Sequence, residues 1–299
     1  MKLSETETGG IKMKKKLLLL FITMMTVLVL AACGSGNKES TGGESQKDSE
    51  SSSESKSVLR VGMEAAYAPF NWSQKDDSNG AVPIADSKEF ANGYDVQIAK
   101  RIAEGLGMEL QIVKTDWDGL IPSLQSGAID AVIAGMSPTP ERMEVIDFTD
   151  NYYTSDFVIV VKKDGPYANA KSIHDFEGAK VTAQQGTTHY KVIDQMTGVN
   201  KQVPATDFGQ MRIQLSSGAI DAYISERPEG MSAEAAIEGF TYIVPEDGFE
   251  ADESDTAIAV GLKKGSDLKD KINEILAGIT EDERHQIMEE AIKNQPSQQ

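Results

Sequence analysis

The sequence predicts an α/β protein built from two similar lobes, each with a mixed, mostly parallel sheet flanked by helices. Strand-like and helix-like segments alternate along residues 58–295, which is the pattern of parallel strands connected by helices. The hexapeptide Ser-Gly-Ala-Ile-Asp-Ala occurs twice, at residues 126–131 and 217–222. The length of 299 residues also indicates about two compact units, and 39% hydrophobic residues can supply their cores.

The repeated hexapeptide belongs to a longer similarity. LQSGAIDAVIAG (124–135) matches LSSGAIDAYISE (215–226). Each copy has the pattern of an amphipathic helix that ends at a glycine and is followed by a short strand. We expect each lobe to bring the end of that strand to a shared site. The alternative is a chance similarity between two instances of a common helix–glycine–strand connection.

The expected elements of the first half follow from periodicity and end signals. Asp95 is expected to cap the first helix, with Gly105 and Gly107 at its end. The β-branched run at 157–161 is expected to connect the lobes. The strands are expected at 58–63, 110–114 and 129–134, and the helices at 95–107 and 117–126.

The second half shows the same alternation. Two helices are expected to close the chain, which suits a lobe completed after the chain returns to it. The strands are expected at 180–184, 242–244 and 257–262, and the helices at 188–196, 268–278 and 281–294.

The N-terminal segment has the pattern of an export signal. Four lysines between residues 12 and 16 precede an apolar run at 17–32, which predicts a signal peptide over 1–32; Met13 is an alternative start. Leu30-Ala31-Ala32-Cys33 resembles a bacterial lipobox, which implies a lipid on Cys33. A buried free cysteine or a plain membrane anchor is the alternative. The polar residues 33–57 predict a flexible tether to the extracellular face of the cell membrane.

Composition excludes several function classes. A formal charge of −18 argues against nucleic-acid binding, which needs a clustered basic face. One cysteine and three scattered histidines give no disulfide framework and no metal-ligand spacing, so we expect no metal and no cofactor. The sequence has no nucleophile elbow, HExxH motif or Ser–His–Asp arrangement, so we expect no enzyme.

Seven short motifs occur in this order along the chain: Tyr67-Ala68-Pro69-Phe70, Gly93-Tyr94-Asp95, Trp117-Asp118-Gly119-Leu120, Gly135-Met136-Ser137-Pro138-Thr139, Glu141-Arg142, Asp147-Phe148-Thr149 and Gln185-Gly186-Thr187-Thr188. Together they resemble the extracellular solute-binding proteins of ABC-type importers for polar amino acids (solute-binding protein family 3). The resemblance implies a periplasmic-binding-protein-like fold of type II, with a ligand cleft between its lobes. Lobe 1 would comprise 58–155 plus 256–295, and lobe 2 would comprise 156–255.

The resemblance also implies the function. The protein would capture a free amino acid outside the cell with high affinity, close on it by a hinge motion, and deliver it to the membrane permease of an ABC transporter. A lipid-anchored monomer on a Gram-positive cell fits the N-terminal segment. Two alternatives stay open: an enzyme on the same fold, such as a dehydratase, and an amino-acid sensor outside transport.

A buried zwitterion needs partners for both charges, because an unpaired buried charge costs several kcal/mol. Arg142 suits the ligand carboxylate, since its guanidinium is planar, charged and bidentate. Its alternative is a solvated helix arginine paired with Glu141 or Glu144. Thr187 and Thr188 start a helix in lobe 2 and are implied to hold the other carboxylate oxygen. An ordinary N-cap is compatible with that role.

The resemblance places the ligand ammonium on Glu226. The family usually has aspartate at this position, so glutamate is longer by one methylene. The alternative is a surface glutamate beside Arg227. The Gly135 carbonyl and the Ser137 hydroxyl are expected to complete the ammonium shell, and Met136 lies between them in the same site segment.

The ligand side chain would lie between two aromatic residues, Tyr67 and Trp117, for which core packing is the alternative. Glu64 and Gln184 are implied to line its pocket. An acid there accepts from cationic or amide side chains, so arginine, lysine, histidine and glutamine are favoured. The stretch 71–92, longer than usual for the family, is expected as a flap over this pocket or as a surface excursion.

Overall fold

The computed structural model describes residues 57–296. The predicted signal peptide, Cys33 and nearly all of the tether lie outside the described residues. Within 57–296, every helix is too short or too polar to cross a membrane.

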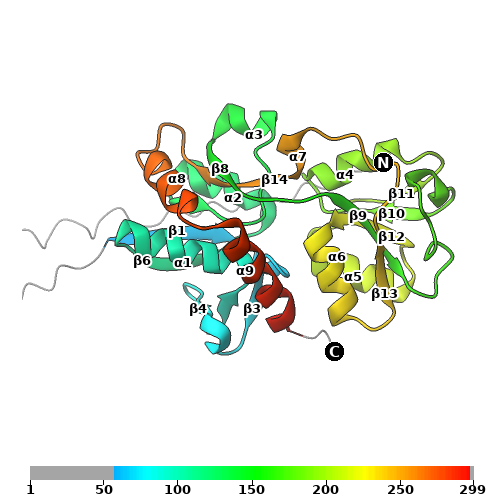
Figure 1. Cartoon of the computed structure of the whole chain (residues 1–299), viewed down its shortest axis with the longest axis horizontal. Coiled ribbons are helices and arrows are strands. Elements are labelled where there is room, and N and C mark those ends of the chain that lie inside the picture. Colours follow the sequence, from blue (N-terminus) through cyan, green and yellow to red (C-terminus); the bar gives the residue numbers. More distant parts are fainter. Residues whose placement is uncertain (1–56, 297–299) are drawn as a thin grey trace, which may run out of the picture. The chain divides into compact units, whose positions relative to one another are not determined.

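The first sheet has five strands in the order β6-β1-β7-β14-β8 (Figure 1). Strand β1 pairs in parallel with β6 and β7, whereas β14 is antiparallel to both β7 and β8. The expected strands at 58–63 and 257–262 are confirmed, while the one at 129–134 is shorter. The strands are β1 (Val58–Met63), β6 (Glu109–Lys114), β7 (Ala131–Val132), β8 (Asp147–Thr154) and β14 (Ala257–Leu262).

Five helices accompany this sheet, and the expected bounds of α2 and α9 are confirmed. In α1 two expectations were wrong. Its N-cap is Gly93, and Asp95 is instead fully buried, where it accepts hydrogen bonds from Asn71 and Tyr152. Gly105 lies inside α1, which ends at Gly107 with φ of 67°. The helices are α1 (Tyr94–Leu106), α2 (Trp117–Ser126), α3 (Pro140–Val145), α8 (Lys269–Ala277) and α9 (Glu281–Asn294).

The stretch 71–92 forms part of a small antiparallel sheet with the order β2-β3-β5-β4. Asn71 and Trp72 are buried, which anchors this sheet to the first lobe's core. Its first strand carries Tyr67, so the sheet helps to position one of the predicted site residues. The elements are β2 (Ala66–Tyr67), β3 (Asn71–Gln74), η1 (Ser78–Gly80), β4 (Val82–Pro83) and β5 (Phe90–Asn92).

The second sheet has the order β11-β10-β12-β9-β13. Strand β9 lies antiparallel between β12 and β13, and its residues 157–161 are buried. The expectation that 157–161 connects the lobes was therefore wrong, because an unbroken apolar run suits an internal strand. The strands are β9 (Phe157–Lys162), β10 (Lys180–Thr182), β11 (Asn200–Lys201), β12 (Ala222–Glu226) and β13 (Phe240–Ile243).

Short helices accompany the second sheet. The helix expected at 188–196 is split into α4 and a 3₁₀ turn, and Thr187 caps α4 through its side chain. The helices are η2 (Ile173–Phe176), α4 (Thr188–Val192), η3 (Ile193–Gln195), α5 (Phe208–Ser217) and α6 (Arg227–Ala236).

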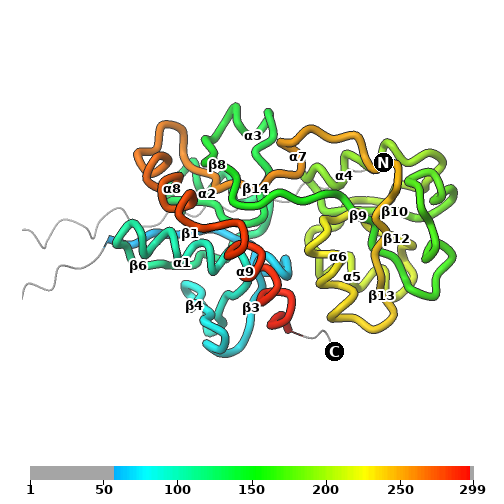
Figure 2. Tube along the Cα trace, viewed as in Figure 1, coloured from blue at the N-terminus to red at the C-terminus, as the bar shows by residue number. Residues whose placement is uncertain are grey.

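The α/β fold expected from the sequence is confirmed. We use "lobe 1" for the first sheet, the small sheet and their helices, and "lobe 2" for the second sheet and its helices. The chain passes from β8 to β9 through Ser155 and Asp156, and it returns through α7 (Glu253–Thr256) into β14, as Figure 2 traces. The sequence-derived lobe boundaries remain a proposal that these crossings support.

Candidate functional site

The predicted site residues meet where lobe 1 contacts lobe 2. Three of the hydrogen bonds that cross between the lobes there are made by predicted site residues. Tyr67 Oη donates to Glu226 Oε1 at 2.9 Å, Gln184 Nε2 donates to Glu64 Oε1 at 2.8 Å, and Arg142 Nη2 donates to the Gly186 carbonyl at 3.0 Å. Residues far apart in the sequence therefore share one contact region.

Arg142 is the cation of this region. The capped start of α3 places it, because Thr139 Oγ1 accepts from the Arg142 amide. Its guanidinium lies 5.1 Å above the Trp117 ring and donates to the carbonyls of Ser137 (2.8 Å) and Gly186. Burial lowers the pKa of Arg142 to about 10. Glu141 does not pair with it; it pairs with Lys191 of lobe 2 at 2.8 Å.

Two hydroxyls beside Arg142 share one acceptor. Ser137 Oγ of lobe 1 and Thr188 Oγ1 of lobe 2 donate to the Asp255 carbonyl, at 3.0 and 3.2 Å. Both threonine and serine are about 5% exposed. Asp255 belongs to α7, the returning crossover, so the two lobes and the segment that joins them meet at this carbonyl.

Three further predicted residues have contacts within their own surroundings in the protein. The Thr187 hydroxyl donates to the Gln184 carbonyl at 2.6 Å and caps α4, which is the N-cap alternative. Met136 is buried in the lobe 1 core. Gly135 has φ of 62°, and a Cβ there would lie 2.8 Å from the Tyr67 ring, so the aromatic ring requires glycine at this position.

Glu226 is buried at the end of β12, only 3% exposed, so the alternative of a surface glutamate beside Arg227 is wrong. Arg227 pairs with Asp156 instead. Glu226 Oε1 accepts a hydrogen bond from Tyr67 Oη and lies 3.2 Å from His189 Nε2. Its Oε2 is buried with no hydrogen-bond partner. A buried carboxylate oxygen without a donor is costly, which marks a place for a cationic group.

The two predicted aromatic residues have different neighbours. The Tyr67 ring stacks on Phe208 of lobe 2, with centroids 4.0 Å apart and planes 13° apart, and it also contacts Phe70. Trp117 is half-buried under Arg142. Tyr67 thus lies at the Glu226 end of the contact region, and Trp117 lies at the Arg142 end.

Glu64 follows β1 and is 6% exposed. The pKa of Glu64 is raised to about 8, chiefly by burial and also by the negative charges of Asp207, Asp116 and Asp118, while the hydrogen bond from Gln184 acts in the opposite direction. Gln184 is itself held by a second hydrogen bond to the Thr206 carbonyl at 3.0 Å. The region around Glu64 therefore strongly favours an added positive charge.

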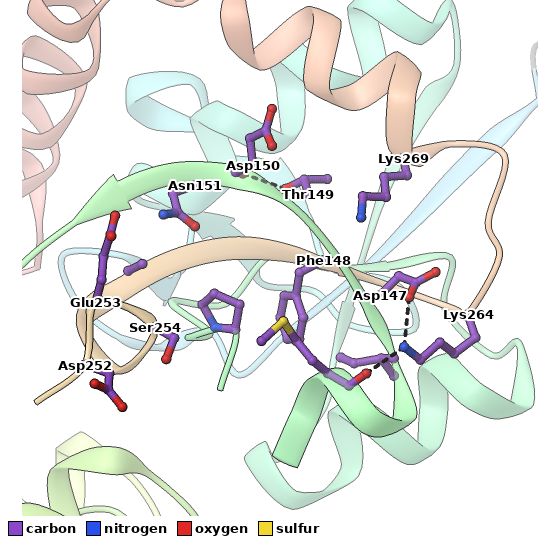
Figure 3. A pocket seen from close by; sticks show the side chains of 14 residues that line it. Asp147, Phe148, Thr149, Asp150, Asn151, Asp252, Glu253, Ser254, Lys264 and Lys269 are labelled. Carbon is purple, nitrogen blue, oxygen red and sulfur yellow. Dashed lines mark hydrogen bonds and ion pairs between the residues drawn. The ribbon is translucent and has the colours of Figure 1, made fainter. Parts of the chain in front are cut away.

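A separate groove of about 780 Å³ is lined by Met143 of α3 and by residues of β8 and α7. Figure 3 shows its wall of Asp147, Asp150, Asp252 and Glu253, with Lys264 bound to Asp147. It contains none of the predicted ligand-binding residues. No cluster of metal-ligating side chains occurs within residues 57–296.

Sequence reasoning missed three residues of the contact region. Phe208 stacks on Tyr67, His189 contacts Glu226, and the Asp255 carbonyl binds both hydroxyls. Phe208 follows the N-cap Asp207, and its apolar side chain at a helix start was the available signal. Asp255 accepts these two hydrogen bonds through its backbone carbonyl, which every residue has, so the sequence carries no signal for this role.

A two-lobed α/β fold whose predicted ligand-binding residues gather where the lobes meet is the architecture of a solute-binding protein. Residues 59–294 match the model of the bacterial extracellular solute-binding proteins, family 3. The chain belongs to this family.

Three comparisons describe its relatives. The arginine-binding extracellular protein ArtP of Bacillus subtilis is 31% identical over 250 residues, which span 82% of this chain and 85% of that protein. An amino-acid ABC transporter substrate-binding protein from Streptococcus pneumoniae, solved with L-arginine, is 28% identical with a TM-score of 0.69, over 79% of this chain and 94% of that one.

The third comparison bears on the enzyme alternative. An ancestral amino-acid-binding protein, described as a precursor of cyclohexadienyl dehydratase, is 30% identical with a TM-score of 0.64, over 79% of this chain and 95% of that one. It is itself a binding protein, so the dehydratase alternative has less support than the binding function.

Proposed function

We propose that this protein captures a free amino acid with a cationic or polar side chain outside the cell and delivers it to the permease of an ABC transporter. One observation carries the proposal: donors for a carboxylate and an unpartnered buried acceptor for an ammonium lie in the same contact region between the lobes. One relative is named as an arginine-binding protein and another was solved with L-arginine, and both support the choice of ligand class.

The ligand carboxylate would bind at the Arg142 end. The Arg142 guanidinium and the hydroxyls of Ser137 and Thr188 now donate only to backbone carbonyls. A carboxylate is a stronger acceptor than a carbonyl, because charge-assisted hydrogen bonds are about twice as strong. The carboxylate would replace those carbonyls and would be held from both lobes, which favours the closed arrangement.

The ligand ammonium would bind Glu226 Oε2. Tyr67 donates to Oε1 and so orients the carboxylate, His189 Nε2 lies 3.2 Å from the same oxygen, and Oε2 has no hydrogen-bond partner. The arrangement makes Tyr67 a positioning group of lobe 1 for an anion of lobe 2.

The ligand side chain would extend toward Glu64. With three further acids around it, Glu64 favours a guanidinium or ammonium group over a neutral or anionic one. Its raised pKa means that a cation would bind together with release of a proton near neutral pH.

We further propose that the protein acts as a monomer held at the cell surface by a lipid on Cys33, and that it does not turn over its ligand. Replacing Cys33 by serine should move the protein from the membrane fraction into the medium. Retention of the C33S variant in the membrane fraction would contradict the lipid assignment.

Thermal unfolding with each common amino acid tests the function. The purified protein is first unfolded and refolded to remove carried ligand. A ligand at 100 times its dissociation constant stabilises the fold by about 2.7 kcal/mol. We expect a shift with arginine or lysine and no shift for the Arg142→Ala variant. A shift with glutamine alone would contradict the cationic preference, and no shift with any amino acid would contradict amino-acid capture.

A further inference from the structure

We infer that His189 is a positioning residue for the ligand ammonium: the charge of its imidazole decides whether Glu226 is free to bind that ammonium, so that capture weakens in acid. This role deepens the proposed function and rests on it. His189 is the second residue of α4 and is 6% exposed. Its Nε2 lies 3.2 Å from Glu226 Oε1, on the carboxylate whose other oxygen has no hydrogen-bond partner.

Two aromatic rings hold the His189 imidazole in place. Phe157 of β9 and Phe208 of α5 both meet it edge-on, with ring centroids 5.4 and 6.2 Å away. Both imidazole nitrogens are buried, and neither has a hydrogen-bond partner. Together with Glu226 Oε2, three buried polar atoms without hydrogen bonds lie in this one pair of side chains. Such atoms are rare in folded proteins, and a cluster of them indicates a site that a ligand completes.

Glu226 is the acid that faces the imidazole. It is the one acid within 4.0 Å of His189 among residues 57–296. Tyr67 of β2 donates to the same Oε1 at 2.9 Å, and burial raises the pKa of Tyr67 well above its ordinary value, so the phenol stays protonated. The other charged groups on the elements that contact α4 have partners of their own: Asp255 of α7 with the Asp252 amide, Asp194 of η3 with Lys201, Asp207 and Arg212 of α5 with the Gln210 amide and Glu229, and Lys191 of α4 with Glu141.

The charge of the imidazole changes what Glu226 can bind. A neutral imidazole leaves the negative charge of the carboxylate for a ligand ammonium at Oε2. A protonated imidazole pairs with the carboxylate at Oε1, so the ammonium would meet a site whose charge is already balanced. Two cations on one buried carboxylate leave one positive charge unpaired, which is costly. The ligand therefore binds together with the neutral imidazole, and a protonated imidazole must first release its proton.

The pH dependence follows from this exchange. Histidine is the side chain whose charge ordinarily changes between about pH 5 and 8. As the pH falls, the empty protein gains a proton at His189 that the liganded protein does not hold, so the affinity decreases. One proton gives a slope of at most about tenfold in affinity per pH unit. Glu64, whose pKa is raised to about 8, also exchanges a proton when a cation binds, so a variant has to separate the two groups.

The test is isothermal titration of wild-type protein and the His189→Gln variant, from about pH 5.5 to about pH 7.5. The ligand is the amino acid that shifts the unfolding of the wild-type protein most. Glutamine does not titrate, and Glu64 is the same in both proteins. We expect the affinity of His189→Gln, divided by that of the wild type, to rise about tenfold as the pH falls across this range.

A ratio that is constant with pH, or that falls in acid, would overturn the role of His189. A merely structural contribution of the imidazole changes this ratio equally at every pH. His174→Gln is the matched control, because His174 is an exposed histidine of the same lobe. Its ratio to the wild type should not depend on pH, and a trend as large as that of His189→Gln would also count against the role.

Proton NMR of the wild-type protein measures the charge directly and needs no variant at His189. The chain has three histidines, so His174→Gln and His285→Gln identify two of the ring signals and leave the third for His189. At about pH 6 the added ligand should lower the protonated fraction of His189. An unchanged fraction would contradict the exchange. If the wild-type protein binds no amino acid at any pH, the proposed function fails; if it binds one without this proton exchange, only the role of His189 fails.

Discussion

The two copies of the Ser-Gly-Ala-Ile-Asp-Ala repeat build the same local structure in the two lobes. Helix α2 ends at Gly127 with φ of 79°, and α5 ends at Gly218 with φ of 78°. In both copies the following alanine amide returns to a helix carbonyl at 2.9 Å. The left-handed glycine and this bond turn the chain from helix to strand in the same way.

The aspartate of each copy binds a neighbouring parallel strand, β1 in lobe 1 and β10 in lobe 2. The Asp130 amide donates to the Arg60 carbonyl at 2.8 Å, and the Arg60 amide donates back to Asp130 Oδ2 at 2.9 Å. Asp221 and Lys180 repeat both bonds in lobe 2, at 2.9 and 2.8 Å. The repeat therefore carries structural information: its aspartate joins a helix–strand unit to a neighbouring parallel strand.

The copies differ at their last position. Gly135 ends the first copy against the ring of Tyr67, and Glu226 ends the second copy on the hydroxyl of the same tyrosine. A common frame thus presents a backbone surface from one lobe and a charged acceptor from the other. The difference teaches that the repeat positions the site, while its last residue assigns the chemistry.

Glu226→Gln should give the largest effect, because it removes the charge from the end of the second copy. The glutamine oxygen can still accept from Tyr67, so the fold is kept while the proposed partner of the ligand ammonium is lost. We expect ligand affinity to fall by about 2 kcal/mol or more, roughly thirtyfold, in isothermal titration. Glu226→Asp should lose less. If the Glu226→Gln variant bound the ligand with wild-type affinity, Glu226 at the end of β12 would not contact the ligand.

The buried acids of the two lobes sharpen the comparison. Glu229 in lobe 2 is paired with Arg212, whereas Asp95 in lobe 1 has only neutral donors, Asn71 and Tyr152. Burial raises the pKa of Asp95 to about 7. Between pH 4 and 7 the folded protein keeps a proton that the unfolded chain has released, so stability falls as pH rises.

The expected slope from Asp95 is at most about 1.4 kcal/mol per pH unit. Urea unfolding at several pH values should show it as the difference between wild-type and Asp95→Asn, since asparagine does not titrate. The difference should be largest below pH 4 and decline up to pH 7. A difference independent of pH would contradict a protonated Asp95.

Gly135→Ala should be the next largest change. The new methyl group would meet Tyr67 at 2.8 Å in addition to the strain of a positive φ, and overpacking of this kind costs about 1–3 kcal/mol. Gly127→Ala is the matched control, since it has a similar φ and no heavy atom within 4 Å of its Cβ. If denaturant unfolding showed the same loss of free energy of unfolding in both variants, the Tyr67 ring would move to accommodate the new methyl group.

The smallest effect concerns the two aspartates. Asp130 also forms a bidentate ion pair with the Arg60 side chain, at 2.9 and 2.7 Å, which Asp221 lacks. The pair is partly exposed, so it adds about 0.5–1 kcal/mol. Asp130→Ala should destabilise the protein by that much more than Asp221→Ala. The two variants should lose equal free energy of unfolding in 0.5 M salt and should differ more in low salt. That result would assign the difference to the ion pair between Asp130 and Arg60.

Much of the fold could be predicted because its signals are local. The bounds of β1, α2, β14 and α9 follow from alternation, periodicity and cap residues. Asp95 could not be predicted in the same way. Its sequence position suits a cap, yet Tyr152, far along the chain, holds its carboxylate inside the core. Strand β7 is shorter than its apolar run because the chain turns toward Gly135.

The candidate site shows the same distinction between residues with local sequence signals and residues placed by long-range contacts. Motifs indicated Arg142, Thr188, Glu226 and Glu64, and the fold brings these four to one contact region. Phe208 and His189 depend on how two lobes face each other, and no local pattern records that. The stacking partner of Tyr67 could therefore be found only from the structure.

The strand order has a consequence for how the protein is made. Strand β14 lies between β7 and β8, so the first sheet stays incomplete until residue 262 has been synthesised. The second sheet needs only residues 157–243. During vectorial synthesis, lobe 2 can therefore complete its sheet before lobe 1 does. The last step is the insertion of β14 between β7 and β8. This pairing joins segments far apart in the sequence, and non-local pairing of this kind makes folding slow.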